Sequence, residues 1–163
     1  MKESHDNAGV IAPPPLIALA AVLIGVLLDW LLPAYVLVVL LSLEARIGVG
    51  VLLIVGGFVL GLSGRNTFVR SGTHVNPYKP SSALVTTGIF AHVRNPMYVG
   101  LAFLVAGIGI ALASDWTLVM LVAAALTIHY GVVKREESYL EAKFGEPYRQ
   151  YMASVPRYGW PPH

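Results

Sequence analysis

The sequence predicts an all-α integral membrane protein with four transmembrane helices, the last two forming a helical hairpin. Its 163 residues are 56% hydrophobic and only 12% charged, whereas a soluble domain carries about 25% charged residues. Four segments without Lys or Arg are each 17 or 18 residues long, close to the ~20 residues that cross a bilayer. Ten of the eleven basic residues lie on one side of these segments, as the positive-inside rule describes.

The four predicted spans are residues 16–32, 47–64, 97–113 and 116–133. Three prolines precede the first span, where proline is tolerated at a helix start, and Pro33 closes it. Segment 34–43 is apolar but too short to cross the membrane, so it either lies at the interface or extends the second helix. Ser114 and Asp115 form the turn between the last two spans and can cap the fourth helix.

The basic residues also orient the chain. Four spans bring both termini, loop 65–96 and tail 134–163 to one side, whereas Arg46 is the single basic residue on the other. We therefore expect one membrane domain, residues 1–163, with both termini and the long loop in the cytoplasm. The membrane is expected to be the cytoplasmic membrane of a prokaryote.

The predicted cytosolic tail is helical. A helix should continue from the last span through Lys143, end at Gly145 and be followed by a short helix over 147–153. At the other terminus, residues 1–12 lack the net basic start and cleavage motif of a secretory signal. We therefore expect the first span to be retained.

Composition excludes several kinds of function. The chain has no cysteine, so disulfides, thiolate metal sites and cysteine nucleophiles are excluded. No basic stripe is interleaved with aromatic residues in the manner of a nucleic-acid surface. The histidines at 74, 92 and 129 lack zinc-binding spacing, so no metal site is expected.

Two polar motifs flank the predicted hairpin and should meet at one membrane face. The first is Arg-Asn-Pro-Met-Tyr-Val-Gly at 94–100, and the second is Glu136 with Glu137. Pro96 begins the third span, so free N–H groups beside Arg94 favour a carboxylate or phosphate there. Adjacent glutamates on a helix point about 100° apart, so one can face the site while the other orients a base such as Arg94 or Lys143. Alternatively, these residues are a membrane anchor, a helix cap and a solvated helix end.

Two features inside the spans allow a structural or a functional reading. His129 lies seven residues before Glu136, on nearly the same face of an ideal helix, and is either a functional ionisable group or bonded to a neighbouring helix. One face of the third span either packs against another helix or receives a flat ligand. Its residues are mostly small: Gly100, Leu104, Gly107 and Ala111.

The long loop carries three residues suited to an anionic lipid or substrate headgroup. They are Arg70, His74 and Lys79. The alternative is that this loop only anchors the chain at the membrane surface. A polar loop of this length is often a binding loop or a lid.

Taken in order, five segments resemble the integral-membrane methyltransferases that include isoprenylcysteine carboxyl methyltransferases and phospholipid N-methyltransferases. The segments are 84–90, 94–100, 136–137, 144–148 and 155–157. The resemblance covers about 47–158 and implies an S-adenosylmethionine pocket made by the last hairpin and the tail. The isoprenylcysteine enzymes usually have histidine where this chain has Asn95, which disfavours carboxyl methylation of prenylated cysteine.

The motifs and the resemblance together predict the residues of the site. Cofactor binding is expected at Arg94, Asn95, Pro96, Tyr98, Gly100, His129, Glu136 and Glu137. Catalytic roles are expected for Tyr98, Arg94 and Glu137. Arg94 suits the methionine carboxylate, a glutamate suits the ribose hydroxyls or the amino group, and the Tyr98 ring suits the sulfonium.

The predicted function is S-adenosylmethionine-dependent methyl transfer to a lipid or small lipophilic acceptor entering from the bilayer. The accepting group is a phospholipid amine, a thiol or a carboxylate. Methyl transfer needs alignment and exclusion of water more than a covalent partner. One alternative is an NADPH-dependent reductase resembling the sterol reductases, although Leu101 stands where those usually have aspartate. The other is a non-catalytic membrane scaffold.

Overall fold

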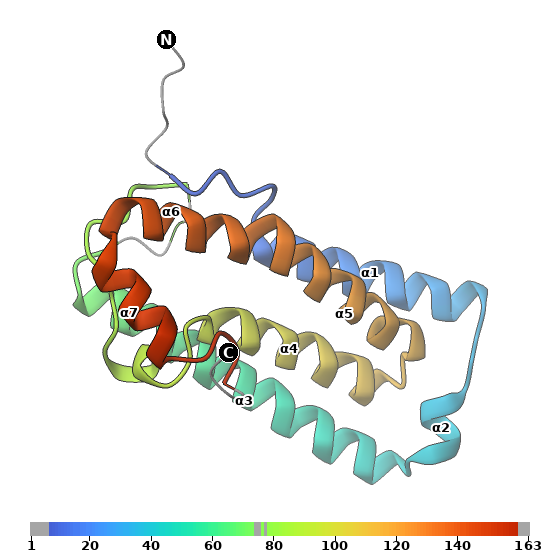
Figure 1. Cartoon of the computed structure of the whole chain (residues 1–163). Helices are drawn as coiled ribbons and strands as arrows, with labels where there is room; N and C mark the ends of the chain where they lie inside the picture. Colours follow the sequence, from blue (N-terminus) through green and yellow to red (C-terminus); the bar gives the residue numbers. More distant parts are fainter. Residues whose placement is uncertain (1–6, 74–75, 77, 160–163) are drawn as a thin grey trace.

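The computed structural model describes residues 7–73, 76 and 78–159. In that part of the chain all regular elements are helical, without any strand. The elements are α1 (Pro14–Leu31), α2 (Val36–Leu40), α3 (Leu43–Arg70), η1 (Gly88–Ala91), α4 (Pro96–Leu112), α5 (Asp115–Ile128), η2 (His129–Val133), α6 (Lys134–Phe144) and α7 (Glu146–Ser154), shown in Figure 1. The all-α prediction is confirmed.

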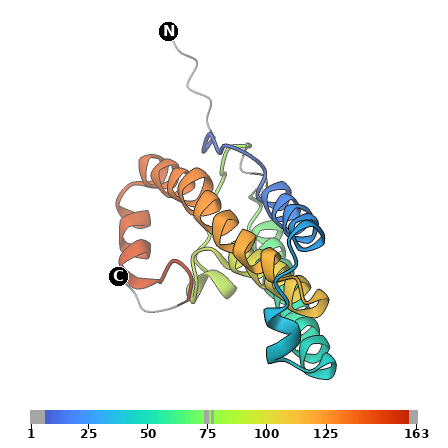
Figure 2. The same ribbon diagram turned by 90° about the vertical axis from the view of Figure 1, so that its right-hand side faces the viewer.

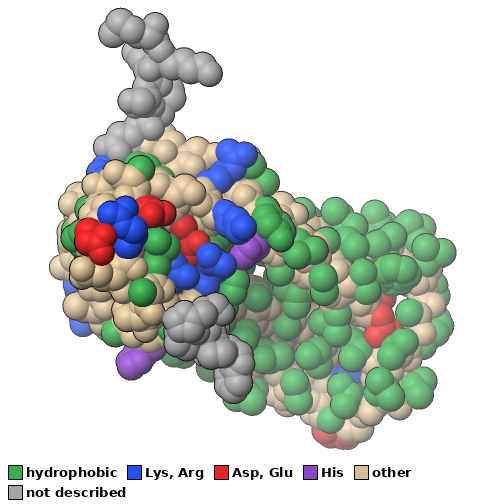
Figure 3. All heavy atoms as spheres, in the orientation of Figure 1, with side chains coloured by type: hydrophobic (Ala, Val, Ile, Leu, Met, Phe, Trp, Pro, Cys, Tyr) green, Lys and Arg blue, Asp and Glu red, His purple; other side chains and the backbone are tan. Residues whose placement is uncertain are grey.

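Within the described residues, three helices are long and apolar enough to cross a membrane. They are α1, α3 and the continuous helix Asp115–Phe144, which comprises α5, η2 and α6. The fourth predicted span is α4, an apolar helix one residue shorter than α1. Many large apolar side chains on these helices are exposed, and they cover one end of the molecule in Figure 3 while charged side chains gather at the other. Exposed apolar surface of this extent is typical of a lipid-facing protein.

The segment between the first two predicted spans forms a helix of its own. Val36–Leu40 is helical as α2, and Ser42 then caps α3 by accepting a hydrogen bond from the Ala45 N–H at 3.3 Å. The predicted span 47–64 lies within α3, which begins at Leu43 and continues to Arg70. A helix satisfies its own backbone groups, so it need not end where the apolar residues end.

Helices α3 and α4 touch through two pairs of glycines. A Cβ added to Gly100 would lie 2.6 Å from the Gly57 carbonyl oxygen, and one added to Gly107 would lie 2.6 Å from that of Gly50. The reciprocal additions meet the α4 carbonyl oxygens at 2.6 and 2.8 Å. The small-residue face therefore serves helix packing, the first of its two readings, with backbones as close as small residues permit.

The turn between α4 and α5 is tied to the end of α1 and to α2. Ser114 caps α5 as predicted, accepting from the Thr117 N–H at 3.2 Å. The Asp115 carboxylate accepts from the N–H groups of Val36 and Leu37 at 2.8 and 3.0 Å. Asp115 thereby satisfies the free donors at the start of α2.

The opposite end of the bundle is closed by α7. Gly145 has a φ of +61°, a conformation suited to glycine, and it ends α6 so that the chain turns into α7. Figure 2 shows α5 and α6 running on in one direction while α7 turns away beyond them. Tyr151 on α7 donates a hydrogen bond of 2.6 Å to the Phe90 carbonyl. The predicted helix continuation, break and short helix are confirmed.

Candidate active site

The two polar motifs meet at the end of the bundle that carries α6 and α7. They bound a polar cavity of about 100 Å³ between the start of α4, the start of α6, the loop after α3, and α7. Six of the eight residues expected to bind the cofactor line it: Arg94, Asn95, Pro96, Tyr98, Glu136 and Glu137. This enclosure is called the polar cavity below.

The chain after α7 lies along the start of α4. Arg94 N–H donates to the Pro156 carbonyl at 2.9 Å, and Asn95 N–H donates to the Arg157 carbonyl at 3.2 Å. The Asn95 side-chain amide donates to the same Arg157 carbonyl at 3.3 Å and does not cap α4. Asn95 therefore holds the C-terminal segment against the site.

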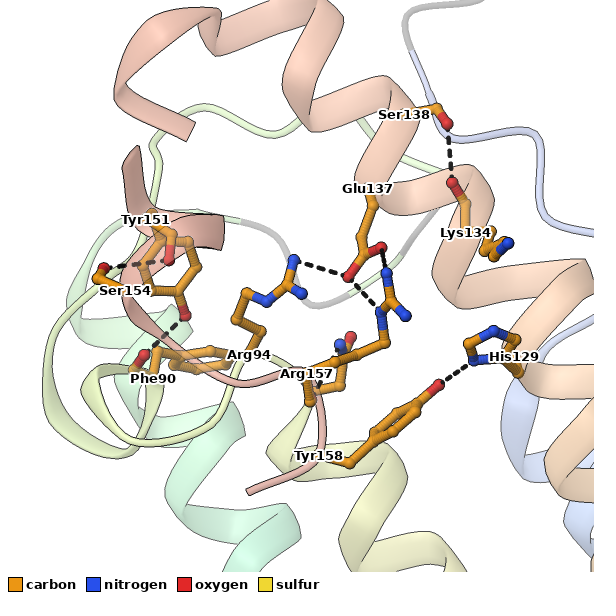
Figure 4. A network of polar contacts seen from close by, with 11 residues as sticks. Phe90, Arg94, His129, Lys134, Glu137, Ser138, Tyr151, Ser154, Arg157 and Tyr158 are labelled. Atoms are coloured by element: carbon orange, nitrogen blue, oxygen red, sulfur yellow. Dashed lines mark hydrogen bonds and ion pairs between the residues drawn. The ribbon is translucent and has the colours of Figure 1, made fainter. Parts of the chain in front are cut away.

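Glu137 accepts contacts from two arginines (Figure 4). Arg157 binds it in bidentate fashion, with Nε and Nη2 at 2.9 and 2.7 Å from the two carboxylate oxygens. Arg94 Nη1 lies 2.9 Å from Glu137 Oε1, and both of these side chains are about nine-tenths buried, at 10% and 11% exposure. The hydrogen bonds that Arg157 donates to Glu137 raise the pKa of Arg157. Two guanidinium groups thus share one carboxylate.

Arg94 has donors left over. Its Nε is buried without a hydrogen-bond partner among the described residues, and its Nη1 contact with Glu137 is an ion pair that lacks hydrogen-bond geometry. Because unsatisfied buried donors are costly, this guanidinium is suited to receive an anionic or acceptor group from a ligand in the polar cavity.

Glu136 points elsewhere than its neighbour. The Tyr98 hydroxyl lies 2.9 Å from both of its carboxylate oxygens and donates to them. The two adjacent glutamates thus make separate contacts: Glu137 pairs with arginines, and Glu136 joins α6 to α4 through Tyr98.

The continuous helix contains a wide turn just before the glutamates. Residues His129–Val133 form the π-helical segment η2, and a Cβ on Gly131 would meet the Ile11 side chain at 2.3 Å. The expectation that His129 and Glu136 share one face assumes 3.6 residues per turn, which η2 does not keep. Glu136 accordingly lines the polar cavity, whereas His129 does not. Such wide turns occur frequently at functional sites.

His129 lines a second hollow, an apolar groove of about 530 Å³ between α4 and α5. Its Nδ1 lies 2.8 Å from the Tyr158 hydroxyl. Partial burial raises the pKa of Tyr158 to about 12, so that hydroxyl stays protonated at neutral pH. Tyr98 lines both the apolar groove and the polar cavity, and is the boundary between them.

Of the remaining predicted site residues, only some lie at the polar cavity. Gly100 packs against α3 and does not line the polar cavity. Lys79 lines it, but Arg70, at the exposed end of α3, does not. His74 lies outside the described residues.

Two site residues received no role from the sequence. Arg157 is the second partner of Glu137, and Tyr148 lines the polar cavity close to Arg94. Burial raises the pKa of Tyr148, so it remains a neutral hydroxyl. Both lie in segments that carry the family resemblance, 155–157 and 144–148. The sequence therefore marked these two segments but did not indicate which residues they contact.

A sequence model of the family described as phospholipid methyltransferase matches residues 45–147. The chain belongs to the phospholipid methyltransferase family. Over 73 residues it is 34% identical to the protein-S-isoprenylcysteine O-methyltransferase of Schizosaccharomyces pombe, a match covering 45% of this chain and 31% of that relative. The match thus spans about a third of that relative's length. No solved structure matches the chain.

This membership favours methyl transfer over the reductase and scaffold alternatives. The family match includes both polar motifs, the hairpin between them and the start of α7. The part of this phospholipid methyltransferase family member that matches the family model therefore includes the α4 and α6 walls of the polar cavity.

Proposed function

We propose that this protein is an S-adenosylmethionine-dependent membrane methyltransferase acting on a lipid or small lipophilic acceptor. The observation that carries the proposal is Tyr98, which separates a polar cavity lined by Arg94 from an apolar groove. A water-soluble methyl donor and a lipid-soluble acceptor need adjoining sites of these two characters.

The side chains of the polar cavity suit the cofactor's functional groups. Arg94, with a buried Nε lacking a partner among the described residues, would hold the methionine carboxylate together with the start of α4. Glu136 would accept from the amino group or a ribose hydroxyl, and the Tyr98 ring would lie against the sulfonium. The bound cofactor supplies an electrophilic methyl group, so alignment and exclusion of water are the tasks left to the protein.

Glu137 would act through the two arginines. It holds Arg94 and Arg157 at once, and so joins the C-terminal segment to one wall of the cavity. The described cavity, about 100 Å³, is smaller than the ~300 Å³ at the low end for ligand pockets. Its walls therefore have to separate when a nucleoside-sized ligand binds.

We further propose four spans, with α4 as the additional one, both termini and the polar cavity on the cytoplasmic side, and α6 and α7 in the cytosolic tail. The basic residues of the α3 end, the loop and the tail support this orientation. Arg70 and Lys79 would then be available to the anionic headgroups of the inner leaflet.

Titration calorimetry of the detergent-solubilised protein tests cofactor binding. We expect S-adenosylmethionine to bind with a Kd of roughly micromolar, and Glu137→Ala to weaken it at least about tenfold. NADPH should give no heat. Absence of cofactor binding by the unmodified protein would refute the proposal. If the cofactor binds, labelled-methyl transfer into a total lipid extract would identify the class of acceptor.

A further inference from the structure

We propose that the apolar groove holds the methyl acceptor as an uncharged lipophilic thiol, and that His129 takes the proton which this thiol loses on methylation. The inference rests on the proposed function, because it places the methyl donor in the polar cavity on the other side of Tyr98. It narrows the acceptor from three chemical classes to one.

The groove offers no charge to an acceptor. Among the described residues lining it, none is Lys, Arg, Asp or Glu, and polar side-chain atoms come from Tyr98, His129 and Tyr158 alone. A carboxylate or an ammonium group loses its hydration there without meeting an opposite charge, which is strongly unfavourable. A thiol is uncharged below its pKa and pays no such penalty.

The nearest cations are engaged elsewhere. Arg157 is bound in bidentate fashion by Glu137, and Lys134 lies 5.3 Å from the centre of the Tyr130 ring. Neither lines the groove. A carboxylate acceptor would therefore have to draw Arg157 away from a carboxylate that it already holds.

His129 is the basic group of the groove, and its ring is held in place. The Tyr130 ring meets it edge-on at a centroid distance of 4.7 Å, and the Tyr158 hydroxyl bonds its Nδ1 (Figure 4). When Nδ1–H donates to the Tyr158 oxygen, the lone pair lies on Nε2 and can accept a proton. A fixed imidazole beside an apolar groove is suited to general-base catalysis.

The proposed step balances with the methyl donor alone. The thiol sulfur forms a bond to the methyl carbon while the bond from that carbon to the sulfonium breaks, and the bonding pair stays on the former sulfonium. The thiol proton moves to His129 Nε2 and later to water. The products are a methyl thioether and the neutral demethylated cofactor, and no oxidant or metal is needed.

Acceptor preference of the unmodified full chain is the first test. Decanethiol, decylamine and decanoate share one chain length and differ in the reacting group, and each is supplied with methyl-labelled S-adenosylmethionine, alongside vesicles of phosphatidylethanolamine. We expect label on decanethiol at a rate at least about tenfold above the others. Preference for another acceptor, or transfer to none of them although the cofactor binds, would overturn the inference.

The second test separates proton transfer from packing. His129→Gln should lower kcat for decanethiol at least about tenfold near pH 7. At about pH 9.5 the deficit should shrink to within about threefold, because hydroxide can then take the thiol proton in place of His129. A deficit of equal size at both pH values would show that His129 acts only in packing.

Controls keep these outcomes distinct. His92→Gln replaces an exposed histidine that lines neither hollow and should leave the rate unchanged at both pH values. Each variant is compared with the unmodified protein at the same pH, because other titratable and charged groups surround His129: Tyr98, Tyr130, Lys134, Glu137, Arg157 and Tyr158. A cofactor Kd of His129→Gln that is unchanged within about twofold verifies that this variant folds. Failure of the unmodified protein to bind the cofactor would instead refute the proposed function.

Discussion

Tyr98 donates its hydroxyl hydrogen to the carboxylate of Glu136, with both carboxylate oxygens 2.9 Å away. This contact joins the first turn of α4 to the first turn of α6 at the boundary between the polar cavity and the apolar groove. Two residues 38 positions apart in sequence thereby fix the separation of the two walls.

Tyr98→Phe removes this contact while keeping the aromatic ring. Glu136 then has no partner among the described residues. Burial raises the pKa of Glu136 to about 7, so its carboxyl is only partly ionised at neutral pH, and the lost hydrogen bond is worth about 0.5–3 kcal/mol. We expect cofactor affinity to fall at least about tenfold, measured by calorimetry. Tyr35→Phe, at the opposite end of the bundle, is the matched control and should bind normally; equal affinity of both variants would contradict the assigned role.

Glu137→Ala removes the carboxylate between two arginines. Arg94 is nine-tenths buried whereas the Arg157 side chain is 34% exposed. The cost of losing the carboxylate is therefore mainly that of leaving the buried Arg94 guanidinium without its counter-ion. Breaking a buried pair costs about 3–5 kcal/mol, and the exposure of Arg157 reduces our expectation to roughly 2 kcal/mol. Thermal unfolding in detergent measures it, with Glu141→Ala as a surface control that should leave the Tm unchanged. An unchanged Tm for Glu137→Ala would show that the cluster contributes nothing to stability.

Gly57→Ala tests the contact between α3 and α4. Its Cβ would lie 2.6 Å from the Gly100 carbonyl oxygen, so the helices must separate, and overpacking of this kind costs about 1–3 kcal/mol. The same substitution at Gly61 places a Cβ with no atom within 4 Å and should be neutral or slightly stabilising. If the two variants unfold at the same temperature, close helix approach is not what stabilises this pair.

Asp115→Ala should loosen the membrane end without affecting the site. It removes two hydrogen bonds to the start of α2, comparable to the loss of a helix cap, which costs about 1 kcal/mol. We expect a lower Tm and an unchanged cofactor Kd, because the polar cavity lies at the other end of the bundle. A weakened Kd would reveal coupling between the two ends.

Local signals predicted much of the fold. The proline run, Ser114 and Gly145 act on their own neighbours, so the start of α1, the cap of α5 and the break before α7 follow from the sequence. The continuation of α3 to Arg70, past the apolar residues of the predicted span, has no counterpart in the apolar pattern.

The site was only partly predictable, for a different reason. Its membership depends on contacts between distant segments: Arg157 reaches Glu137 only because the C-terminal segment bonds to Asn95. The wide turn η2 has no sequence mark of its own, and it moves His129 from the expected cavity to the groove. Ideal helical spacing cannot anticipate an insertion of this kind.

The glycine contacts between α3 and α4 also determine which part of the molecule is rigid and which part can move. Where the backbones of Gly57 and Gly100 touch, the two helices have little room to slide or bend, so we expect them to move as one rigid unit. The dilation required to admit a cofactor then falls on η2, α6 and the C-terminal segment. In an amide hydrogen-exchange experiment, we expect the α3–α4 amides to be the slowest, and cofactor to slow exchange chiefly across α6 and α7.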